Sequence, residues 1–241
     1  KSSNKKYYLK KVTKKFNSPN LNIKTLNFLN WFANYNLVPK GLTIKLHLIG
    51  GQIAENLDKK YYKFYNNFSN PKKYILSTEQ SNSLKEMSKN QNNFNVHLLQ
   101  GTTGSGKTIV YFNLIKKIIK KRKQGLILLP EIGLTNEFEK KFKDFFGFEP
   151  AIWHSGISKN KKKIIWSGLA SGKINIVIGA RSALFLPFKK LGIIIVDEEH
   201  DQSYKQDEGV IYNARDMAIA RANFENIPIN LITAVPSIET F

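Results

Sequence analysis

One eight-residue segment combines glycines, hydroxyl side chains and a lysine in an order that can hold a chain of phosphates. It consists of Gly101-Thr102-Thr103-Gly104-Ser105-Gly106-Lys107-Thr108 and fits the pattern G-x-x-x-x-G-K-[ST]. Glycines let backbone N–H groups converge on phosphate oxygens, and a helix that begins here adds the positive end of its dipole. Lys107 is expected to reach the β- and γ-phosphates, and Thr108 to offer its hydroxyl to Mg²⁺. The segment therefore predicts a site for ATP and Mg²⁺.

A second candidate for chemistry is the acidic segment Asp197-Glu198-Glu199-His200, which follows the most apolar run of the chain. Such a run directs the acidic residues to the carboxyl edge of a parallel sheet, where open α/β folds bind ligands. Asp197 is expected to hold Mg²⁺, directly or through water, and Glu198 to polarise the water that attacks the γ-phosphate. His200 has two interpretations, a part in coupling or a satisfied histidine of the core.

The elements that must position both segments follow from residue 96 onward, where short apolar runs alternate with helical patterns. This alternation is typical of a doubly wound parallel sheet, and the β-branched run 193–196 indicates strands covered on both faces. Apolar residues at helical spacing predict a helix after the phosphate loop, and we interpret the basic run 120–123 at its end as a solvated face. The strands are expected at 96–100, 125–130, 151–153, 174–179, 191–197 and 229–234.

The pattern is different before residue 77. Residues 26–35 predict one amphipathic helix, whereas residues 42–49 alternate like a strand. Aromatic residues among lysines at 61–68 suit either base stacking or the packing of a short element. Ser77-Thr78-Glu79-Gln80 fits a capping box, in which the Gln80 side chain closes the start of a helix.

Composition narrows the partners and the compartment. The formal net charge of +20 favours a polyanion, because lysines that neutralise phosphates release counterions, and nucleic acid is the first candidate. Only four of the 38 basic residues are arginines, so a general bias towards lysine is an alternative source of the charge. The absence of cysteine excludes disulfides and thiolate zinc sites from this chain. No apolar run is long enough to span a bilayer, and we expect a cytoplasmic protein.

These motifs and the segments around them resemble the superfamily 2 helicases, and most closely the primosomal protein N′ (PriA) family of replication-restart DNA helicases. The resemblance is strong over residues 76–241, and weaker over 28–48, which resembles the junction after the family's fork-recognition domain. The segments that carry it are Pro130-Glu131-Ile132-Gly133-Leu134-Thr135 (motif Ia), His154-Ser155-Gly156 and 179–185 (the next DNA-side segments), Asp197–His200 (the DEEH box), and 203–206 with 212–216 (the aromatic-rich loop).

The resemblance implies an ATP-dependent 3′→5′ DNA translocase that acts at stalled replication forks and reloads the replicative helicase. Its implied partners are forked and single-stranded DNA, single-stranded-DNA-binding protein and primosome components, and we expect a monomer. Gln80 would read adenine, which is compatible with capping. Two of the implied DNA-side residues have a structural alternative: Arg181 could form an ion pair, and Tyr212 could pack in the core. The residues implied to touch DNA or to couple it to the ATP site are Glu131, Thr135, Arg181, Ser182, His200, Tyr204, Lys205, Tyr212 and Arg215.

By the same resemblance the chain divides into three parts. Residues 1–50 would end a 3′-DNA-binding region with its junction helix, 51–75 would be a linker in place of a winged helix, and 76–241 would form a RecA-like P-loop NTPase lobe. Motif III, Ser-Ala-Thr-Pro in the family, is Thr233-Ala234-Val235-Pro236 here, so coupling is expected to be altered. Val210 and Ile211 replace an aromatic and a basic residue of the loop, which predicts weaker activation by DNA.

The family's second lobe, its arginine finger and its cysteine zinc module are expected to follow Phe241. Zinc is therefore expected only there, and residues 1–241 alone are expected to hydrolyse ATP negligibly.

Two other functions remain open. One is another superfamily 2 DNA translocase, against which only the aromatic-rich loop and the DEEH box argue. The other is a non-catalytic DNA-bound platform for primosome assembly, which intact Lys107, Thr108, Asp197 and Glu198 disfavour. Stimulation of ATP hydrolysis by forked or single-stranded DNA would separate these functions.

Overall fold

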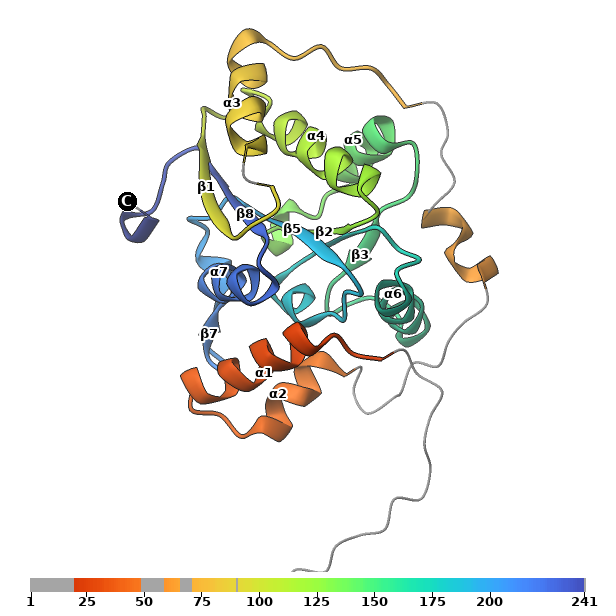
Figure 1. Cartoon of the computed structure of the whole chain (residues 1–241), viewed down its shortest axis with the longest axis vertical. Coiled ribbons are helices and arrows are strands. Elements are labelled where there is room, and N and C mark those ends of the chain that lie inside the picture. The colour runs from red at the N-terminus through yellow and green to blue at the C-terminus, as the bar shows by residue number, and fades with distance from the viewer. Residues whose placement is uncertain (1–19, 49–58, 66–70, 90, 241) are drawn as a thin grey trace, which may run out of the picture.

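The computed structural model describes residues 20–48, 59–65, 71–89 and 91–240. Its centre is a parallel sheet of six strands in the order β1-β8-β5-β2-β4-β3 (Figure 1). All six lie within two residues of their expected bounds. The strands are β1 (Asn95–Gln100), β2 (Gln124–Leu128), β3 (Ala151–Trp153), β4 (Ile176–Gly179), β5 (Leu191–Asp197) and β8 (Pro228–Thr233).

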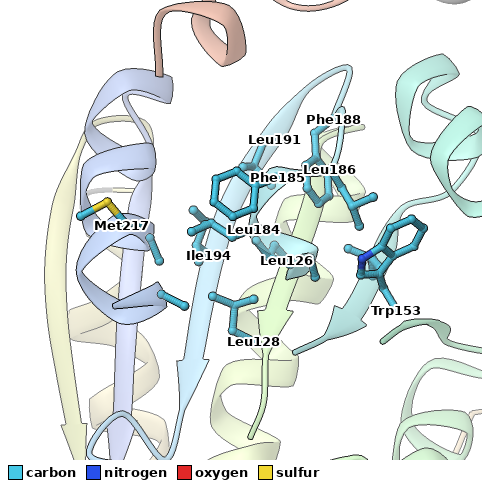
Figure 2. Close-up of a cluster of buried hydrophobic side chains, with 14 of the residues drawn as sticks. Leu126, Leu128, Trp153, Leu184, Phe185, Leu186, Phe188, Leu191, Ile194 and Met217 are labelled. Carbon is cyan, nitrogen blue, oxygen red and sulfur yellow. The ribbon is translucent and has the colours of Figure 1, made fainter. Parts of the chain in front are cut away.

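Helices cover both faces of this sheet, as predicted for a RecA-like lobe. On one face lie α3 (Thr78–Ser88), α4 (Lys107–Lys120) and α5 (Asn136–Phe146), and on the other lie α6 (Lys159–Ser171) and α7 (Ala214–Glu225) (Figure 1). A separate buried core fills each side, and part of the core beneath α7 is drawn in Figure 2. The expected apolar stripe of α4 is buried against the sheet. The predicted fold class is therefore confirmed.

Short elements gather mainly at the carboxyl edge of the sheet. The strands β6 (Lys205–Gln206) and β7 (Tyr212–Asn213) form an antiparallel hairpin within the segment that resembles the aromatic-rich loop. The 3₁₀ turns are η1 (Lys59–Tyr65), η2 (Glu131–Gly133), η3 (Arg181–Phe185), η4 (Gln202–Tyr204) and η5 (Ile238–Thr240). Among the described helices, none is both long and apolar enough to cross a membrane.

Two accessory helices, α1 (Ile23–Tyr35) and α2 (Lys40–His47), form a further layer beneath α7 and η3 (Figure 1). The first confirms the helix predicted at 26–35. The second shows that the predicted strand at 42–49 is wrong over residues 42–47. Thr43 and His47, four residues apart, are buried, while Leu42 and Ile44 are 42% and 48% exposed. The buried face is polar and has helical spacing, so the alternating apolar residues misled the prediction.

An aromatic cluster fixes α1 to the lobe. Phe28 and Phe32 are fully buried. The ring of Phe32 lies edge-on to Phe185 of η3 and Tyr212 of β7, with centroids 5.0 and 5.4 Å away. Because η3 belongs to a predicted DNA-side segment and β7 to the segment that resembles the aromatic-rich loop, α1 is in direct contact with both.

A buried arginine on α7 lies in the same interface. Arg221 is fully buried, donates hydrogen bonds to the carbonyls of Leu184 and Leu186, and lies 5.8 Å from the ring centroid of Phe28. Burial lowers the pKa of Arg221 to about 10, and the nearby Glu225 carboxylate raises it. The guanidinium is therefore still charged at neutral pH.

Glu225, one helical turn beyond Arg221, receives hydrogen bonds from the other side of the interface. Its carboxylate accepts bonds from the Thr25 hydroxyl at 3.1 Å and the Asn22 amide at 3.5 Å. The Lys24 ammonium donates to its backbone carbonyl at 2.7 Å. These contacts join residues about 200 positions apart in the sequence.

On α2, His47 makes the corresponding contact to η3. Its Nδ1 lies 2.6 Å from the Phe185 carbonyl oxygen and must donate, because a carbonyl can only accept. Burial lowers the pKa of His47 to about 4, the bond to Phe185 opposes this, and the charge of Arg221 adds to it. His47 is therefore neutral at physiological pH.

The aromatic segment at 61–68 is described in part. Tyr62 is buried, and its hydroxyl donates to Ser167 of α6 at 3.0 Å. Tyr61 and Phe64 are exposed. Packing therefore accounts for Tyr62, base stacking by the exposed rings stays a prediction, and Phe68 lies outside the described residues.

Candidate nucleotide-binding site

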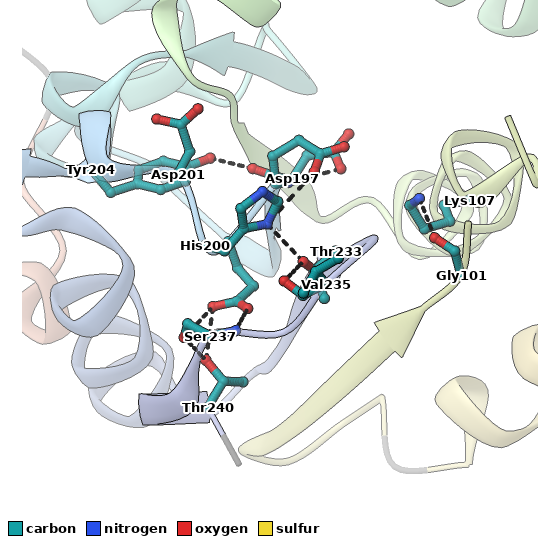
Figure 3. Close-up of polar contacts among 12 residues, drawn as sticks. Gly101, Lys107, Asp197, His200, Asp201, Tyr204, Thr233, Val235, Ser237 and Thr240 are labelled. Atoms are coloured by element: carbon teal, nitrogen blue, oxygen red, sulfur yellow. Dashed lines mark hydrogen bonds and ion pairs between the residues drawn. The ribbon is translucent and has the colours of Figure 1, made fainter. Parts of the chain in front are cut away.

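The two predicted motifs meet at the carboxyl edge of the sheet because their strands are separated by one neighbour. The phosphate loop follows β1, the acidic turn follows β5, and β8 lies between them. The register pairs Gln100 with Thr233 and Ile232 with Asp197. Thr233, the first residue of the segment resembling motif III, therefore sits between the loop and the acidic turn (Figure 3).

The phosphate loop curls around the ammonium group of its own lysine. The left-handed φ angles of Gly104 (+81°) and Gly106 (+83°) are conformations that other residues rarely adopt. The Lys107 Nζ donates to the carbonyl of Gly101 at 2.6 Å (Figure 3) and to that of Thr102 at 3.1 Å. The Gly101 N–H donates to the Thr233 carbonyl at 3.1 Å, which ties the loop to β8. A bound phosphate would offer Lys107 oxygens in exchange for these carbonyls.

Gln80 has a structural role at the same loop. It forms the predicted capping box with Ser77, whose hydroxyl accepts from the Gln80 N–H and whose N–H donates to Gln80 Oε1. Its Nε2 donates to the Ser105 carbonyl at 2.8 Å. A Cβ on Gly106 would lie 2.5 Å from this nitrogen, so glycine is needed for the close approach. The capping interpretation is confirmed, and adenine reading stays a prediction.

Tyr111, which the motifs did not identify, connects the two predicted Mg²⁺ ligands. Its buried hydroxyl donates to Asp197 Oδ2 at 2.8 Å and also makes a hydrogen bond with the Thr108 side chain. Burial raises the pKa of Asp197 to about 6, whereas the bond from Tyr111 and the charge of Lys107 lower it. Tyr111 follows Lys107 by four residues, so both lie on one face of α4; a tyrosine in an otherwise aliphatic stripe was the available signal.

These oxygen donors fit the chemistry of Mg²⁺. Magnesium in nucleotide sites is usually bound by one or two protein oxygens, substrate phosphates and water. Thr108 and Asp197 supply a hydroxyl and a carboxylate joined through Tyr111. Within the described part of the chain, no group of three or more His, Cys, Asp or Glu residues forms a metal site on its own.

Glu198 begins a sharp turn after β5. Its φ of +48° is left-handed, an uncommon conformation for a residue with a side chain that often marks a functional site. The side chain of Glu198 is 45% exposed, whereas Asp197 is buried. The turn therefore leaves the Glu198 carboxylate accessible beside the buried Asp197 carboxylate. This difference suits the predicted roles, in which Glu198 polarises a water and Asp197 holds Mg²⁺.

His200 connects this turn to β8. Its Nδ1 lies 2.8 Å from Thr233 Oγ1, and that hydroxyl donates its single hydrogen to the Val235 carbonyl (Figure 3). Nδ1 must therefore carry the proton and donate to Thr233. The Glu198 carboxylate lies 3.7 Å from the same nitrogen. This geometry favours the coupling interpretation of His200.

Glu199 points away from the nucleotide loop and holds the segment after β8. Its buried carboxylate accepts hydrogen bonds from the Ser237 N–H and hydroxyl, the Thr240 hydroxyl and Arg215 Nη1 at 2.8 to 3.3 Å. Burial raises the pKa of Glu199, but these bonds outweigh burial and leave it below its usual value. Within the acidic segment, Glu199 is thus a structural anchor, which the sequence did not reveal.

The residues predicted to meet DNA fall into two groups. Glu131, Ser182 and Lys205 are exposed, and Arg181 is half-buried and donates to the Lys205 carbonyl. The Thr135 hydroxyl is occupied as the N-cap of α5, where it accepts from the Phe138 N–H. Within this first group, the side chains of Glu131, Ser182 and Lys205 are accessible from solvent.

Tyr204, Tyr212 and Arg215 form the second group and are buried. The Tyr204 hydroxyl lies 2.6 Å from the Asp197 carbonyl and 3.1 Å from that of Leu128, so it joins the ends of β5 and β2. Arg215 bonds to Glu199, Asp216 and Ser237. Their positions favour coupling over direct contact with DNA.

The fold and this site define a P-loop nucleotide-binding lobe of the parallel α/β type. A family profile described as DEAD/DEAH box helicase matches residues 77–240. The chain therefore belongs to the DEAD/DEAH box helicase family.

Two curated relatives narrow this assignment, and a solved structure is similar to the chain. The replication restart protein PriA of Rickettsia conorii is 46% identical over 92% of this chain and 34% of its own length. The replication restart protein PriA of Bacillus subtilis is 37% identical over 83% of this chain and 25% of its own length. The UvsW helicase structure from bacteriophage T4 is 16% identical over 87% of this chain and 70% of that chain, with a TM-score of 0.49. The chain spans about a third of the length of the first PriA relatives.

Proposed function

We propose that this chain is the ATP-binding lobe of a replication-restart DNA helicase that moves 3′→5′ at stalled forks and assembles the primosome. The observation that carries the proposal is the meeting of Lys107, Thr108, Asp197 and Glu198 at neighbouring strand ends. The likeness to PriA relatives over most of the chain supports the choice of DNA as the track.

In the proposed reaction, Lys107 binds the β- and γ-phosphates and the backbone of the phosphate loop surrounds them. Thr108 and Asp197 hold Mg²⁺, which neutralises charge on the phosphates when bound. Glu198 orients the attacking water and takes up its proton. Tyr111 positions the Asp197 carboxylate through its 2.8 Å hydrogen bond.

Coupling to DNA is proposed to run through contacts on both sides of the acidic turn. Tyr204 joins the hairpin to the Asp197 carbonyl, and His200 joins the turn to Thr233. Thr233 supplies a hydroxyl here although the segment departs from the family's motif III, which supports a retained connection. Gln80 is proposed to read adenine with the part of its amide not used by the loop.

Partners and location follow the same proposal. We expect forked and single-stranded DNA to cross Glu131, Arg181, Ser182 and Lys205. Single-stranded-DNA-binding protein and primosome components are proposed as partners of a cytoplasmic monomer. We expect residues 1–241 alone to bind ATP weakly at best and to hydrolyse it negligibly, because an arginine that typically contributes about 10³–10⁵ in rate comes from a second lobe in such motors.

The test is steady-state ATP hydrolysis by the full-length protein with no DNA, single-stranded DNA and a synthetic fork. A replication-restart helicase should show stimulation by DNA and should unwind the fork's lagging strand with 3′→5′ polarity. Hydrolysis that ignores every DNA would contradict the proposal. ATP binding without hydrolysis would favour a non-catalytic platform instead.

A further inference from the structure

A small basic pocket lies at the edge of the sheet opposite the nucleotide site, where β2 and β5 begin. Its volume is about 150 Å³, and none of the residues that line it is acidic. Among the described residues, no ion pair joins its three cationic side chains to a carboxylate. The residues that line the pocket are Arg122, Gln124, Ser171, Gly172, Asn175, Lys189 and Lys190.

The backbone at Arg122 is unusual for a residue with a side chain. It has a left-handed φ of +56° just after α4, and its N–H donates to the Ile119 carbonyl at 2.8 Å. The ends of α5 and α6 use Gly147 and Gly172 for the same left-handed conformation, which glycine adopts most easily. An arginine therefore lines the pocket at a position just after α4 where the backbone conformation favours glycine.

A buried glutamine holds the pocket walls in place. Gln124 donates from Nε2 to the carbonyls of Leu169 at 3.0 Å and Ile174 at 2.7 Å, and its Oε1 accepts from the Lys190 N–H at 2.9 Å. These bonds tie the end of α6, the turn after it and the turn before β5 to the start of β2. The lysines and Arg122 are therefore presented by segments that are already fixed relative to one another.

We propose that this pocket binds a phosphate group, either as a free anion or as a phosphodiester of a nucleic acid strand outside the nucleotide site. Three cations around one small space repel each other, and an anion between them relieves that repulsion. The planar guanidinium of Arg122 offers paired donors to phosphate oxygens, and Lys189 and Lys190 add point charges. The basic run 120–123, interpreted from sequence as a solvated face, thereby includes part of a binding site.

The test compares two double variants of the 241-residue chain that lose the same charge. Arg122→Gly/Lys190→Gln removes two cations of the pocket and gives the left-handed position its preferred residue, so its melting temperature should not fall. Lys85→Gln/Lys140→Gln removes two exposed cations from α3 and α5 as the matched control. The wild type and both variants are titrated with inorganic phosphate at constant ionic strength while backbone NMR shifts are followed, with those of Gln124 and Gly172 reporting the pocket.

In the wild type and the control, Gln124 and Gly172 should show a saturable shift with phosphate. In the pocket variant the affinity reported by these residues should fall by about tenfold or more, the loss expected for charge-assisted hydrogen bonds. Residues of the phosphate loop report binding at the nucleotide site separately. In a second arm, the affinity for single-stranded DNA is measured against salt. Loss of two phosphate contacts should lower the slope of log K by about 1.4.

If the pocket variant loses affinity for inorganic phosphate but binds single-stranded DNA as the control does, the result would support a free anion as the ligand. A reduced salt slope in the pocket variant alone would support a phosphodiester. The proposal is overturned if the pocket variant and the control behave alike in both arms. This outcome is independent of ATP hydrolysis and leaves the proposed helicase function untouched.

Discussion

Charged residues are withdrawn from water in two regions of this molecule, the nucleotide edge and the interface between α1 and α7. At the nucleotide edge, the buried Asp197 lies beside the half-exposed Glu198, and Lys107 bonds only to carbonyls of its own loop. At the accessory interface, Arg221 and Glu225 are almost fully buried and bond to protein groups on neighbouring elements. Burial of charge is therefore common to both regions, and access to a ligand distinguishes them.

This difference teaches that a shifted pKa does not by itself mark a reactive group. Burial displaces the pKa of Asp197 and of Arg221 alike. Only Asp197 adjoins an exposed carboxylate, a strained turn and a loop of backbone donors. We therefore expect substitutions at the nucleotide edge to change function with little loss of stability, and substitutions at the accessory interface to do the reverse.

The largest expected effect separates the two neighbouring carboxylates. Glu198→Gln should preserve MgATP binding and slow hydrolysis by about 10²–10⁴, because the amide cannot take a proton from water. Asp197→Asn should instead weaken Mg²⁺-dependent binding. Steady-state hydrolysis by the full-length protein and binding of a fluorescent ATP analogue measure the two effects. Normal hydrolysis by the Glu198 variant would refute its role as general base.

Next in size is the loss of the phosphate-loop lysine. Lys107→Ala should reduce turnover by about 10²–10³, as expected when one charge-stabilising donor is removed. Its melting temperature should match the wild type, since within the described part of the chain the Lys107 ammonium bonds only to two loop carbonyls. Steady-state ATP hydrolysis by the full-length protein checks the turnover. Thermal unfolding with and without MgATP checks the stability and the loss of binding, because the nucleotide should stabilise only the wild type. A large drop in melting temperature without ATP would remove the contrast between the two regions.

At the accessory interface, Arg221→Met should lower the free energy of unfolding by about 3–5 kcal/mol, because Glu225 and two carbonyls lose a buried cation. ATP affinity of the folded fraction should stay unchanged. The double variant Arg221→Met/Glu225→Gln should recover part of the stability, since the orphaned carboxylate is also neutralised. Urea unfolding measures each value; equal stability of the single variant and the wild type would contradict the proposed role of this charge.

The smallest effect concerns pH. Because the folded-state pKa of His47 is about 4 and the usual value is 6.5, the unfolded chain binds more protons between these values. The contribution of His47 to the free energy of unfolding is fully present above about pH 6.5. It is lost as pH falls towards 4, by about 3 kcal/mol in total. His47→Asn keeps a donor for the Phe185 carbonyl and should flatten unfolding stability over this window. Identical pH slopes for both proteins would show that His47 does not titrate on unfolding.

Sequence reasoning succeeded where the signal was local. The apolar β-branched runs, the glycine pattern around Lys107 and the acids after Val196 each predict structure from a few adjacent residues, and all six strands were located. It failed where the determining contacts are distant. The buried His47 contacts Phe185 and Trp166, which lie more than 100 residues away in the sequence, and the partners of Glu225 lie about 200 residues away.

The candidate site shows the same limit. Its loop and carboxylates were predicted, whereas Tyr111 and the Glu199 anchor depend on which side chains meet across α4, β5 and the segment after β8. The tautomer of His200 depends on a single hydroxyl of β8. The tyrosine in the aliphatic stripe of α4 was the single signal for these contacts, and it did not reveal the partner Asp197.

The packing of α1 also limits how short a soluble version of this lobe can be. A chain begun near residue 76, just before α3, would leave the rings of Phe185 and Tyr212 without the cover of Phe32. Exposed aromatic patches of this kind promote self-association. Light scattering should therefore show aggregates for residues 76–241 at concentrations where residues 1–241 stay dispersed, even though every residue proposed to touch ATP is present in both.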